Sequence, residues 1–140
     1  MEHHLVLRVI CKLLVPLILL FALYVQFHGD FGPGGGFQAG VLFGAGFILY
    51  GTVFGLGHFR SVVRPALLRT VAACGLLLYL LVGVAGILLG GNYLDYSVLR
   101  ENPASGQHLG IFLVELGVGL TVAAVMISLF YAFADRRFRE

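Results

Sequence analysis

Charged residues are scarce in this chain. Only 11% of its 140 residues are Asp, Glu, Lys or Arg, whereas 59% are hydrophobic. A soluble domain of this size has too little interior to bury so much apolar side chain. The composition therefore excludes a soluble globular protein. It predicts an all-α integral membrane protein whose residues 1–140 form a single membrane domain.

The residue patterns of enzymes and metal sites are also missing. The two cysteines, Cys11 and Cys74, stand alone in apolar sequence without Cys-x-x-Cys spacing or a neighbouring histidine set. Isolated cysteines of this kind usually pack as small hydrophobic residues. No Ser/His/Asp or Cys/His arrangement indicates nucleophilic catalysis. We expect no enzyme activity, no catalytic residue, no metal, no cofactor and no nucleic-acid partner.

Four apolar runs are each long enough for a helix to cross the hydrocarbon core, which takes about 20 residues. Because irregular backbone cannot face lipid, each span is expected to be helical. No small-x-small cleavage site follows the first run, which favours a retained helix over a cleaved signal peptide. The predicted spans are residues 9–27, 37–57, 70–90 and 109–134.

The basic residues predict the orientation of these spans. On one side of a four-span chain lie Arg8, Lys12, Arg60, Arg64, Arg69, Arg136, Arg137 and Arg139, and on the other side only Arg100. Basic residues accumulate in cytoplasmic segments of membrane proteins. Both termini are therefore expected in the cytoplasm, with the Gly-Pro loop between the first two spans and the 91–108 loop facing outward.

Glycine is abundant, with 20 residues, and it recurs at helical spacing. The small-x-x-x-small pattern lets helix backbones approach closely in lipid. These stripes either pack the four helices of this chain together or face other subunits, and the second interpretation is favoured because three spans carry them. The expected packing positions are Gly40, Gly44, Gly51 and Gly55 in the second span, and Gly86 and Gly90 in the third.

One ionisable residue, Glu115, lies well inside an apolar run. It is roughly 9 Å below the start of the fourth span at 1.5 Å rise per residue. Such residues usually face a bundle interior or a water-filled path. Glu115 is either a proton or cation site or a structural carboxyl that bonds to a neighbouring helix. His108, seven residues earlier on the same helical face, is a candidate for the outer end of a polar path.

The loop between the first two spans is rich in glycine and also contains His28 and Asp30. Two candidate ligands in such a run rarely suffice for a metal site. A phosphate-binding loop would end in Lys-Ser or Lys-Thr, which is absent. We favour a rigid re-entrant or packing turn, in which the glycines permit positive φ angles and His28 makes a polar contact.

The loop motif resembles the signature of the B subunit of Mrp (also Mnh or Sha) multisubunit cation/proton antiporters. It reads His28-Gly-Asp-Phe-Gly-Pro-Gly-Gly-Gly-Phe-Gln-Ala-Gly40, and the run Gly110-Ile-Phe-Leu-Val-Glu-Leu-Gly-Val is similar to the start of the family's fourth helix. The resemblance covers essentially the whole chain. It implies functional roles for His28, Pro33, Gly34, Gly35, Gly36, Phe37, Gly40 and Glu115.

The resemblance implies a small multi-pass subunit of a bacterial inner-membrane complex that exchanges Na⁺ for protons. Its partners would be the other membrane subunits and the lipid bilayer, and its role would be in assembly, with Glu115 contributing to an ion pathway. An alternative is the homologous small subunit of a membrane-bound hydrogenase or related redox complex. A second alternative is an independent homo-oligomeric channel, which is disfavoured because self-sufficient transporters usually contain several buried charges.

Overall fold

The computed structural model describes residues 2–29 and 34–136, and in these ranges it contains helices and no strand. Four of the helices are long and apolar enough to cross a membrane. The chain is thus a multi-pass helical membrane protein, as predicted. The elements in chain order are α1 (Glu2–His28), α2 (Gly36–Phe54), α3 (Leu56–Val62), α4 (Pro65–Leu88), the 3₁₀ helix η1 (Tyr96–Leu99) and α5 (Pro103–Arg136).

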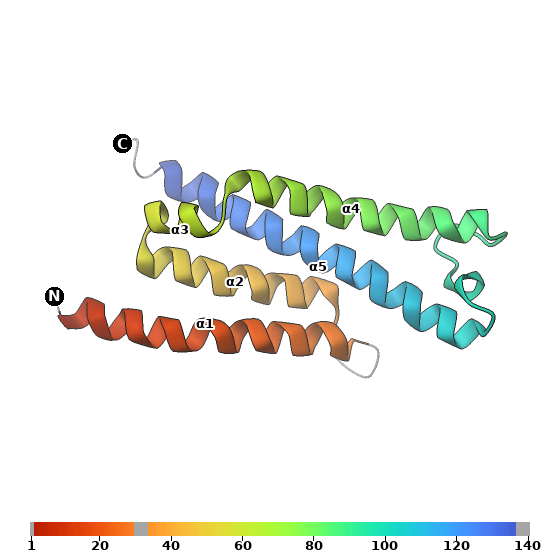
Figure 1. Ribbon diagram of the computed structural model, residues 1–140, viewed down its shortest axis with the longest axis horizontal. Helices are drawn as coiled ribbons and strands as arrows, with labels where there is room; N and C mark the ends of the chain where they lie inside the picture. Colours follow the sequence, from red (N-terminus) through yellow and green to blue (C-terminus); the bar gives the residue numbers. More distant parts are fainter. Residues whose placement is uncertain (1, 30–33, 137–140) are drawn as a thin grey trace.

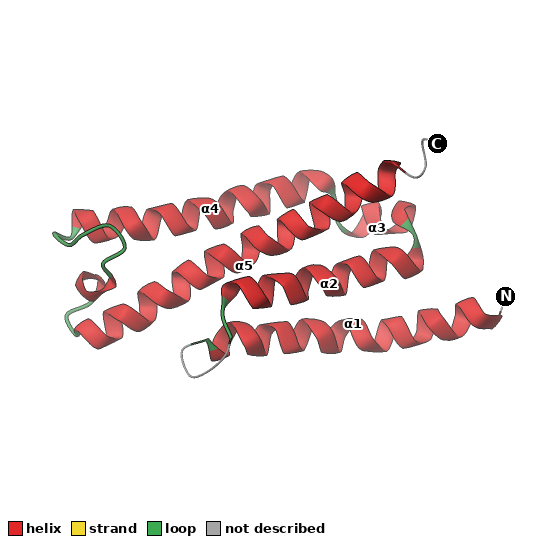
Figure 2. Ribbon diagram, turned by 180° about the vertical axis from the view of Figure 1, so that it is seen from behind, coloured by secondary structure: helices red, strands yellow, loops and turns green. Residues whose placement is uncertain are grey.

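The four long helices lie side by side in the order α1, α2, α5, α4, as both ribbon views show (Figures 1 and 2). Helix α5 runs obliquely between α2 and α4 and contacts both along much of its length. The beginning of α1 and the end of α5 lie at the same end of the molecule. An even number of spans produces this arrangement.

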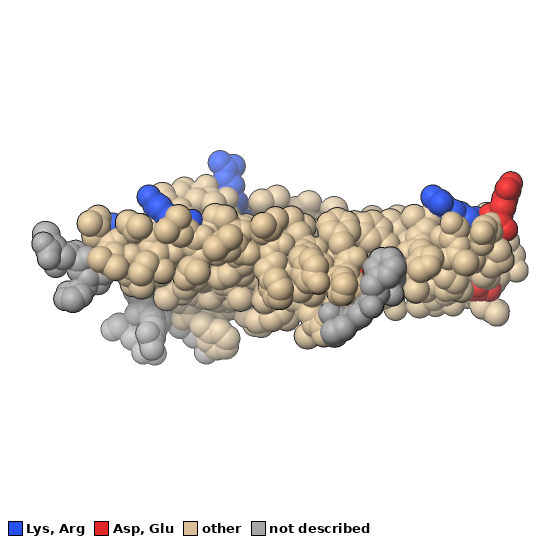
Figure 3. Space-filling model, turned by 90° about the horizontal axis from the view of Figure 1, so that it is seen from below, with Lys and Arg blue, Asp and Glu red and all other residues tan. Residues whose placement is uncertain are grey.

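Charged side chains gather toward the two ends of the molecule (Figure 3). On the face shown, most Lys and Arg atoms lie toward one end, and Asp and Glu atoms lie toward the other, beside a basic group. Between them is a broad band of uncharged residues, and many large apolar side chains of the spanning helices are exposed. This distribution is that of a protein whose middle faces lipid or other membrane subunits.

The second span ends earlier than its predicted limit at residue 57. Helix α2 stops at Phe54 because Gly55 has a φ of 88°, a left-handed conformation that glycine adopts without steric cost. The chain then forms the short helix α3, whose first two residues fell within the predicted second span and whose other residues fell between the second and third spans. Helix α4 begins with Pro65 in its first turn. Amides of the first turn have no hydrogen-bond partner within the helix, so the missing amide hydrogen of proline removes no helical bond.

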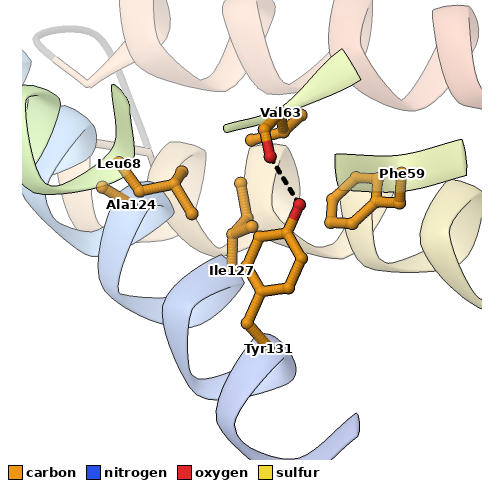
Figure 4. Packing of buried hydrophobic residues seen from close by; sticks show 6 residues of the cluster. All are labelled: Phe59, Val63, Leu68, Ala124, Ile127 and Tyr131. Atoms are coloured by element: carbon orange, nitrogen blue, oxygen red, sulfur yellow. Dashed lines mark hydrogen bonds between the residues drawn. The ribbon is translucent and has the colours of Figure 1, made fainter. Parts of the chain in front are cut away.

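Helix α3 packs under the C-terminal half of α5 and forms the main buried cluster with it and with α4 (Figure 4). The hydroxyl of Tyr131 donates a hydrogen bond to the backbone carbonyl of Val63, which fixes the connection between α3 and α4. Nearby, Arg60 and Asp135 form an exposed ion pair at 2.8 Å. Exposed ion pairs contribute little to the free energy of folding, so the cluster is stabilised mainly by the packing of its buried side chains. Its buried members are Phe59, Val63, Leu68, Ala124, Ile127 and Tyr131.

Glycines allow α5 to approach both of its neighbours. A Cβ atom on Gly40 of α2 would lie 2.6 Å from the carbonyl oxygen of Gly119. On the other side, a Cβ atom on Gly75 of α4 would lie 2.6 Å from the carbonyl oxygen of Gly117. Real Cβ atoms do not approach backbone oxygens so closely. Close helix contacts through small residues are a common basis of association in lipid.

The connection from α4 to α5 folds back on the helices it joins. Asp95 caps η1 by accepting hydrogen bonds from the amide and the hydroxyl of Ser97. These bonds lower the pKa of Asp95 below its ordinary value. Gly90 ends the preceding turn with a φ of 89°. The segment is therefore an ordered structure and not a plain linker.

Candidate functional site

A turn at the junction of α1 and α2 is built from Gly34, Gly35 and Gly36, which we call the glycine turn. The amide of Gly35 donates a 3.3 Å hydrogen bond to the carbonyl of Val25 in the last part of α1. Gly35 has a φ of 124°, which strains any residue with a side chain. The backbone of α2 therefore starts in a conformation that depends on glycine at position 35.

The glycine turn packs directly against Glu115 of α5. A Cβ atom on Gly36 would overlap the carbonyl oxygen of Glu115, and one on Gly35 would lie 3.1 Å from its carboxylate Oε1. On the α1 side, a Cβ atom on Gly29 would lie 2.7 Å from Oε2. The carboxylate thus lies against two glycine positions, Gly29 and Gly35, where side chains would displace it, and Gly36 packs against the backbone of the same residue. The structure brings together two features that are about 80 residues apart in the sequence.

A cavity of about 300 Å³ opens beside this carboxylate. One wall consists of the glycine turn with Phe37 and Gln38, and the other consists of one face of α5. Glu115 is half-buried at the boundary. A carboxylate that lines such a cavity can bind and release a proton, or attract a cation, in the interior of the protein. The α5 residues in the wall are Val114, Glu115 and Val118.

The position of this site along the helices can be given relative to α4. Gly117, two residues after Glu115, packs against Gly75. Gly75 lies 10 residues after the start of α4 and 13 residues before its end, since α4 runs from 65 to 88. The glycine turn is therefore level with the middle of α4. Figure 1 shows the same relation at the end of the molecule opposite the termini, where α4 and α5 extend well beyond the end of α1 and the start of α2.

The two histidine candidates come from different helices, α1 and α5. His28 is the last residue of α1, and its ring stacks on Tyr24 with centroids 5.1 Å apart. His108 is exposed in α5, two helical turns or about 10 Å before Glu115. Phe37 is exposed at the start of α2, and Pro33 lies outside the described residues.

The candidate packing glycines divide into three groups. Gly40, Gly44 and Gly51 of α2 are buried in this chain, where Cβ atoms would meet Val122, Met126 and Phe130 of α5. Gly86 is buried against the segment that follows α4. A Cβ atom on Gly55 or Gly90 would meet no atom within 4 Å, and both residues have positive φ. The contacts of the first group are internal to the chain.

Three residues of this region had no assigned role in the sequence analysis. Gly29 faces the Glu115 carboxylate, and Gly119 lies against the side chain of Gln26 and the backbone of Gly36. Gln26 is buried, with 6% of its surface exposed. Its signal in the sequence was a lone amide near the end of an apolar helix. The glycines gave no separate signal because the chain contains so many.

Over the described ranges, no three His, Cys, Asp or Glu residues lie together as a possible metal site. Comparison with known proteins gives the family. A family model described as "Domain related to MnhB subunit of Na+/H+ antiporter" matches residues 6–128. The chain belongs to the MnhB family. This agrees with the resemblance seen in the loop motif and in the start of the fourth span.

MnhB relatives match the chain over nearly its whole length. A protein named "Putative antiporter subunit mnhB2" from Staphylococcus haemolyticus (strain JCSC1435) is 32% identical over 136 residues, which cover 95% of this chain and 96% of the relative. A protein of the same name from Staphylococcus aureus (strain Newman) is 31% identical over 139 residues, covering 97% and 98%. The chain is thus a small multi-pass membrane protein of a family of Na⁺/H⁺ antiporter subunits.

Proposed function

We propose that this MnhB-family chain is a component of a Na⁺/H⁺ antiporter complex in the bacterial inner membrane, where it contributes Glu115 to an ion pathway. It acts as a transporter subunit and not as an enzyme. The observation that carries the proposal is the enclosure of the Glu115 carboxylate by the glycine turn, beside a cavity at the level of the middle of α4.

The depth of the turn supports a role in ion movement. Non-helical backbone at membrane depth is tolerated only where protein buries it or where it lines a water-filled space. The glycine turn meets both conditions, since it packs against α5 at Glu115 and lines the cavity beside that residue. We therefore propose a re-entrant turn, with water in the cavity that reaches the carboxylate.

Among the acidic residues of the spanning helices, Glu115 is the one whose position suits proton or cation exchange inside the protein. The other acidic residues of the spanning helices, Glu2 and Asp135, lie at the ends of α1 and α5. A carboxyl at membrane depth is costly to keep ionised. It can therefore accept a proton from the cavity and release it when a cation or a basic group of another subunit comes near. Gly29 and Gly35 let the backbone lie close to this carboxylate, and the cavity beside it gives the space for that exchange.

The rest of the pathway is assigned to other subunits. Self-sufficient transporters place several charged groups and discontinuous helices around a midplane site. This chain offers one carboxylate and a turn, so its helices assist a pathway whose main ion sites lie elsewhere in the complex. The basic residues near the beginning of α1, in α3 and at the end of α5 support a cytoplasmic location of both termini under the positive-inside rule.

The test is Glu115→Gln in the full complex, compared with Glu101→Gln as a matched control. Glutamine keeps the size and the hydrogen-bonding capacity of the side chain but cannot ionise. Glu101 carries the same chemical group in the exposed segment before α5. We expect Glu115→Gln to remove most Na⁺-driven proton movement in everted membrane vesicles, while the complex keeps all its subunits. Glu101→Gln should exchange ions like the wild type.

Two results would contradict the proposal. Normal exchange by a fully assembled Glu115→Gln complex would make Glu115 a structural carboxyl. Ion exchange by vesicles that contain only this chain would instead show that the chain needs no companion subunits.

A further inference from the structure

Four side chains from α1, α2 and α3 lie together at the end of the molecule where the N-terminus lies (Figure 1). The Nζ atom of Lys12 in α1 lies over the ring of Phe54 in α2, 5.8 Å from its centroid. The ring of Tyr50 stacks on Phe54 with centroids 4.5 Å apart, and the ring of His58 in α3 lies 6.1 Å from that of Phe54. We call these four residues the basic-aromatic patch.

The positive charge of Lys12 is not neutralised by any described side chain of this protein. The one ion pair among the described side chains joins Arg60 to Asp135. A cation over an aromatic ring is attracted to the ring but keeps its full charge. Arg8, also exposed, lies four residues before Lys12 and therefore on the same face of α1. The patch thus offers positive charge to an anion from outside the chain.

Tyr50 and His58 add a hydrogen-bond donor to this charge. The hydroxyl of Tyr50 and Nε2 of His58 are 2.9 Å apart, so the two side chains share a hydrogen bond. A neutral pair has two polar hydrogens, one on the hydroxyl and one on the imidazole ring. Their mutual bond uses one of them, whichever tautomer His58 adopts. The other is left to donate to an acceptor outside the patch, because no described residue accepts it.

The patch lies at the depth of lipid headgroups. Phe54 is the last residue of α2, one of the four candidate spans, and His58 lies just beyond that span in α3. Tyrosine and lysine near the ends of spanning helices are typical of the interface between membrane and water. From Lys12 toward the middle of α1, apolar side chains are exposed and can contact acyl chains. They include Leu13, Leu17 and Leu20, with exposed fractions of 67%, 61% and 65%.

We propose that the basic-aromatic patch binds the phosphate group of an anionic phospholipid. Lys12 neutralises the phosphate charge, and the Tyr50–His58 pair donates a hydrogen bond to a phosphate oxygen. Basic sites of this kind between spanning helices bind anionic headgroups. The site selects a lipid such as phosphatidylglycerol, whose headgroup is uncharged beyond the phosphate. In phosphatidylcholine a cation follows the phosphate, and Lys12 and Arg8 would repel it.

The exposure of the patch favours a lipid over a carboxylate of another subunit. Lys12 and His58 are both exposed, and α1 is the outermost helix of the row and packs mainly on α2. Lipid phosphates surround a membrane protein at this depth on every side, whereas a carboxylate must come from one helix in one register. A carboxylate of another subunit is therefore an outcome that the test must distinguish.

The test is thermal unfolding of the full chain in mild detergent with increasing phosphatidylglycerol or phosphatidylcholine. We expect phosphatidylglycerol to stabilise the wild type at a lower concentration than phosphatidylcholine. Lys12→Gln should raise the half-maximal phosphatidylglycerol concentration about fivefold, the effect expected from losing one basic residue near a lipid surface. Arg69→Gln is the matched control, because it removes one positive charge from an exposed position of α4, at the other edge of the row. Equal effects of the two substitutions would overturn the proposal.

A double variant tests the donor. Tyr50→Phe together with His58→Phe keeps two aromatic rings and removes their polar hydrogens. We expect it to bind phosphatidylglycerol severalfold more weakly than the wild type does, and unchanged binding would overturn the site. Inorganic phosphate replaces the lipid in a parallel titration. Stabilisation by inorganic phosphate at the same concentrations would show that the patch binds the free anion, and the lipid proposal would fail.

Membranes that contain the complete complex separate a lipid from a protein partner. We expect the Lys12→Gln chain to co-purify with the same subunits as the wild type. Loss of a subunit would assign Lys12 to a protein carboxylate and overturn the lipid site. The proposal does not depend on the ion pathway, since Glu115→Gln should bind phosphatidylglycerol like the wild type. Each proposal can therefore fail without the other.

Discussion

Gly36→Ala is the most direct test of the contact between the glycine turn and Glu115. The new Cβ atom would overlap the carbonyl oxygen of Glu115 and would lie 2.6 Å and 2.8 Å from its carbonyl carbon and Cα. Ordinary contacts between carbon atoms begin near 3.5 Å, so α2 and α5 must separate locally by about 1 Å. All three atoms belong to the backbone of α5, which cannot rotate away as a side chain can.

The expected loss of stability follows from this geometry. Overpacking a close contact costs about 1–3 kcal/mol, and we expect the upper end because only backbone can yield. A loss near 3 kcal/mol lowers the folding equilibrium constant by about 100-fold. The displaced turn should also disturb the Glu115 carboxylate. Ion exchange is therefore expected to fall even where the variant is assembled.

The assay is thermal unfolding of the purified chain in mild detergent, followed by ion exchange in vesicles that contain the complex. Gly57→Ala is the matched control, because a Cβ atom there meets nothing within 4 Å and alanine favours the helix α3. We expect the control to melt at or slightly above the wild-type temperature. If Gly36→Ala melts like the control, the glycine turn does not contact α5 as described.

Two further predictions concern the parts that hold the helices in place. Tyr131→Phe removes the hydrogen bond to the Val63 carbonyl and should cost about 1–3 kcal/mol in the free energy of unfolding, measured by thermal unfolding in detergent. Equal melting temperatures would exclude a role for this bond. Hydrogen bonds from Ser97 lower the pKa of Asp95. Their contribution to stability is therefore complete at neutral pH and is lost only as the pH falls through the lowered pKa. Protection of the Ser97 amide against hydrogen exchange, measured relative to the intrinsic rate at each pH, should fall at low pH in the wild type and should be weaker at neutral pH in Asp95→Ala. Unchanged protection in Asp95→Ala would contradict this.

The sequence predicted the spanning helices well because their signal is local. Apolar length and the absence of charge identify each span without knowledge of its neighbours. The ends of the spans were less predictable. Helix α2 stops at Phe54 because Gly55 adopts a positive φ, and a glycine in an apolar run does not reveal its conformation in advance. The short helix α3 was missed for the same reason.

The parts of the candidate site were predictable, but their meeting was not. The Gly-Pro loop and Glu115 were each distinctive in the sequence. That Gly36 lies against the backbone of Glu115 depends on how α2 crosses α5, which no local pattern specifies. The position of the turn along the helix axes also depends on packing. Its place near the middle of α4 follows from the contact of Gly75 with Gly117 in a different pair of helices.

Gln26 shows a third limit of the sequence. A lone amide in an apolar helix is visible in the sequence, but it has many possible partners. Only the structure shows that one end of the side chain faces Gly119 while Nε2 lies buried without a partner among the described residues. The apolar groove that Gln26 lines takes its residues from α1, α2, α3, α4 and α5, so no continuous stretch of sequence marks it.

The central place of α5 has a consequence for biosynthesis. Both α2 and α4 take their main contacts from α5, yet α5 follows both of them in the chain. Since chains are synthesised from the N-terminus, the three spans before α5 must wait in the bilayer, with their glycine surfaces uncovered, until α5 has been made. A chain truncated before Pro103 would therefore lose not one helix of four but the surface that joins the others, and quality-control proteases should remove it.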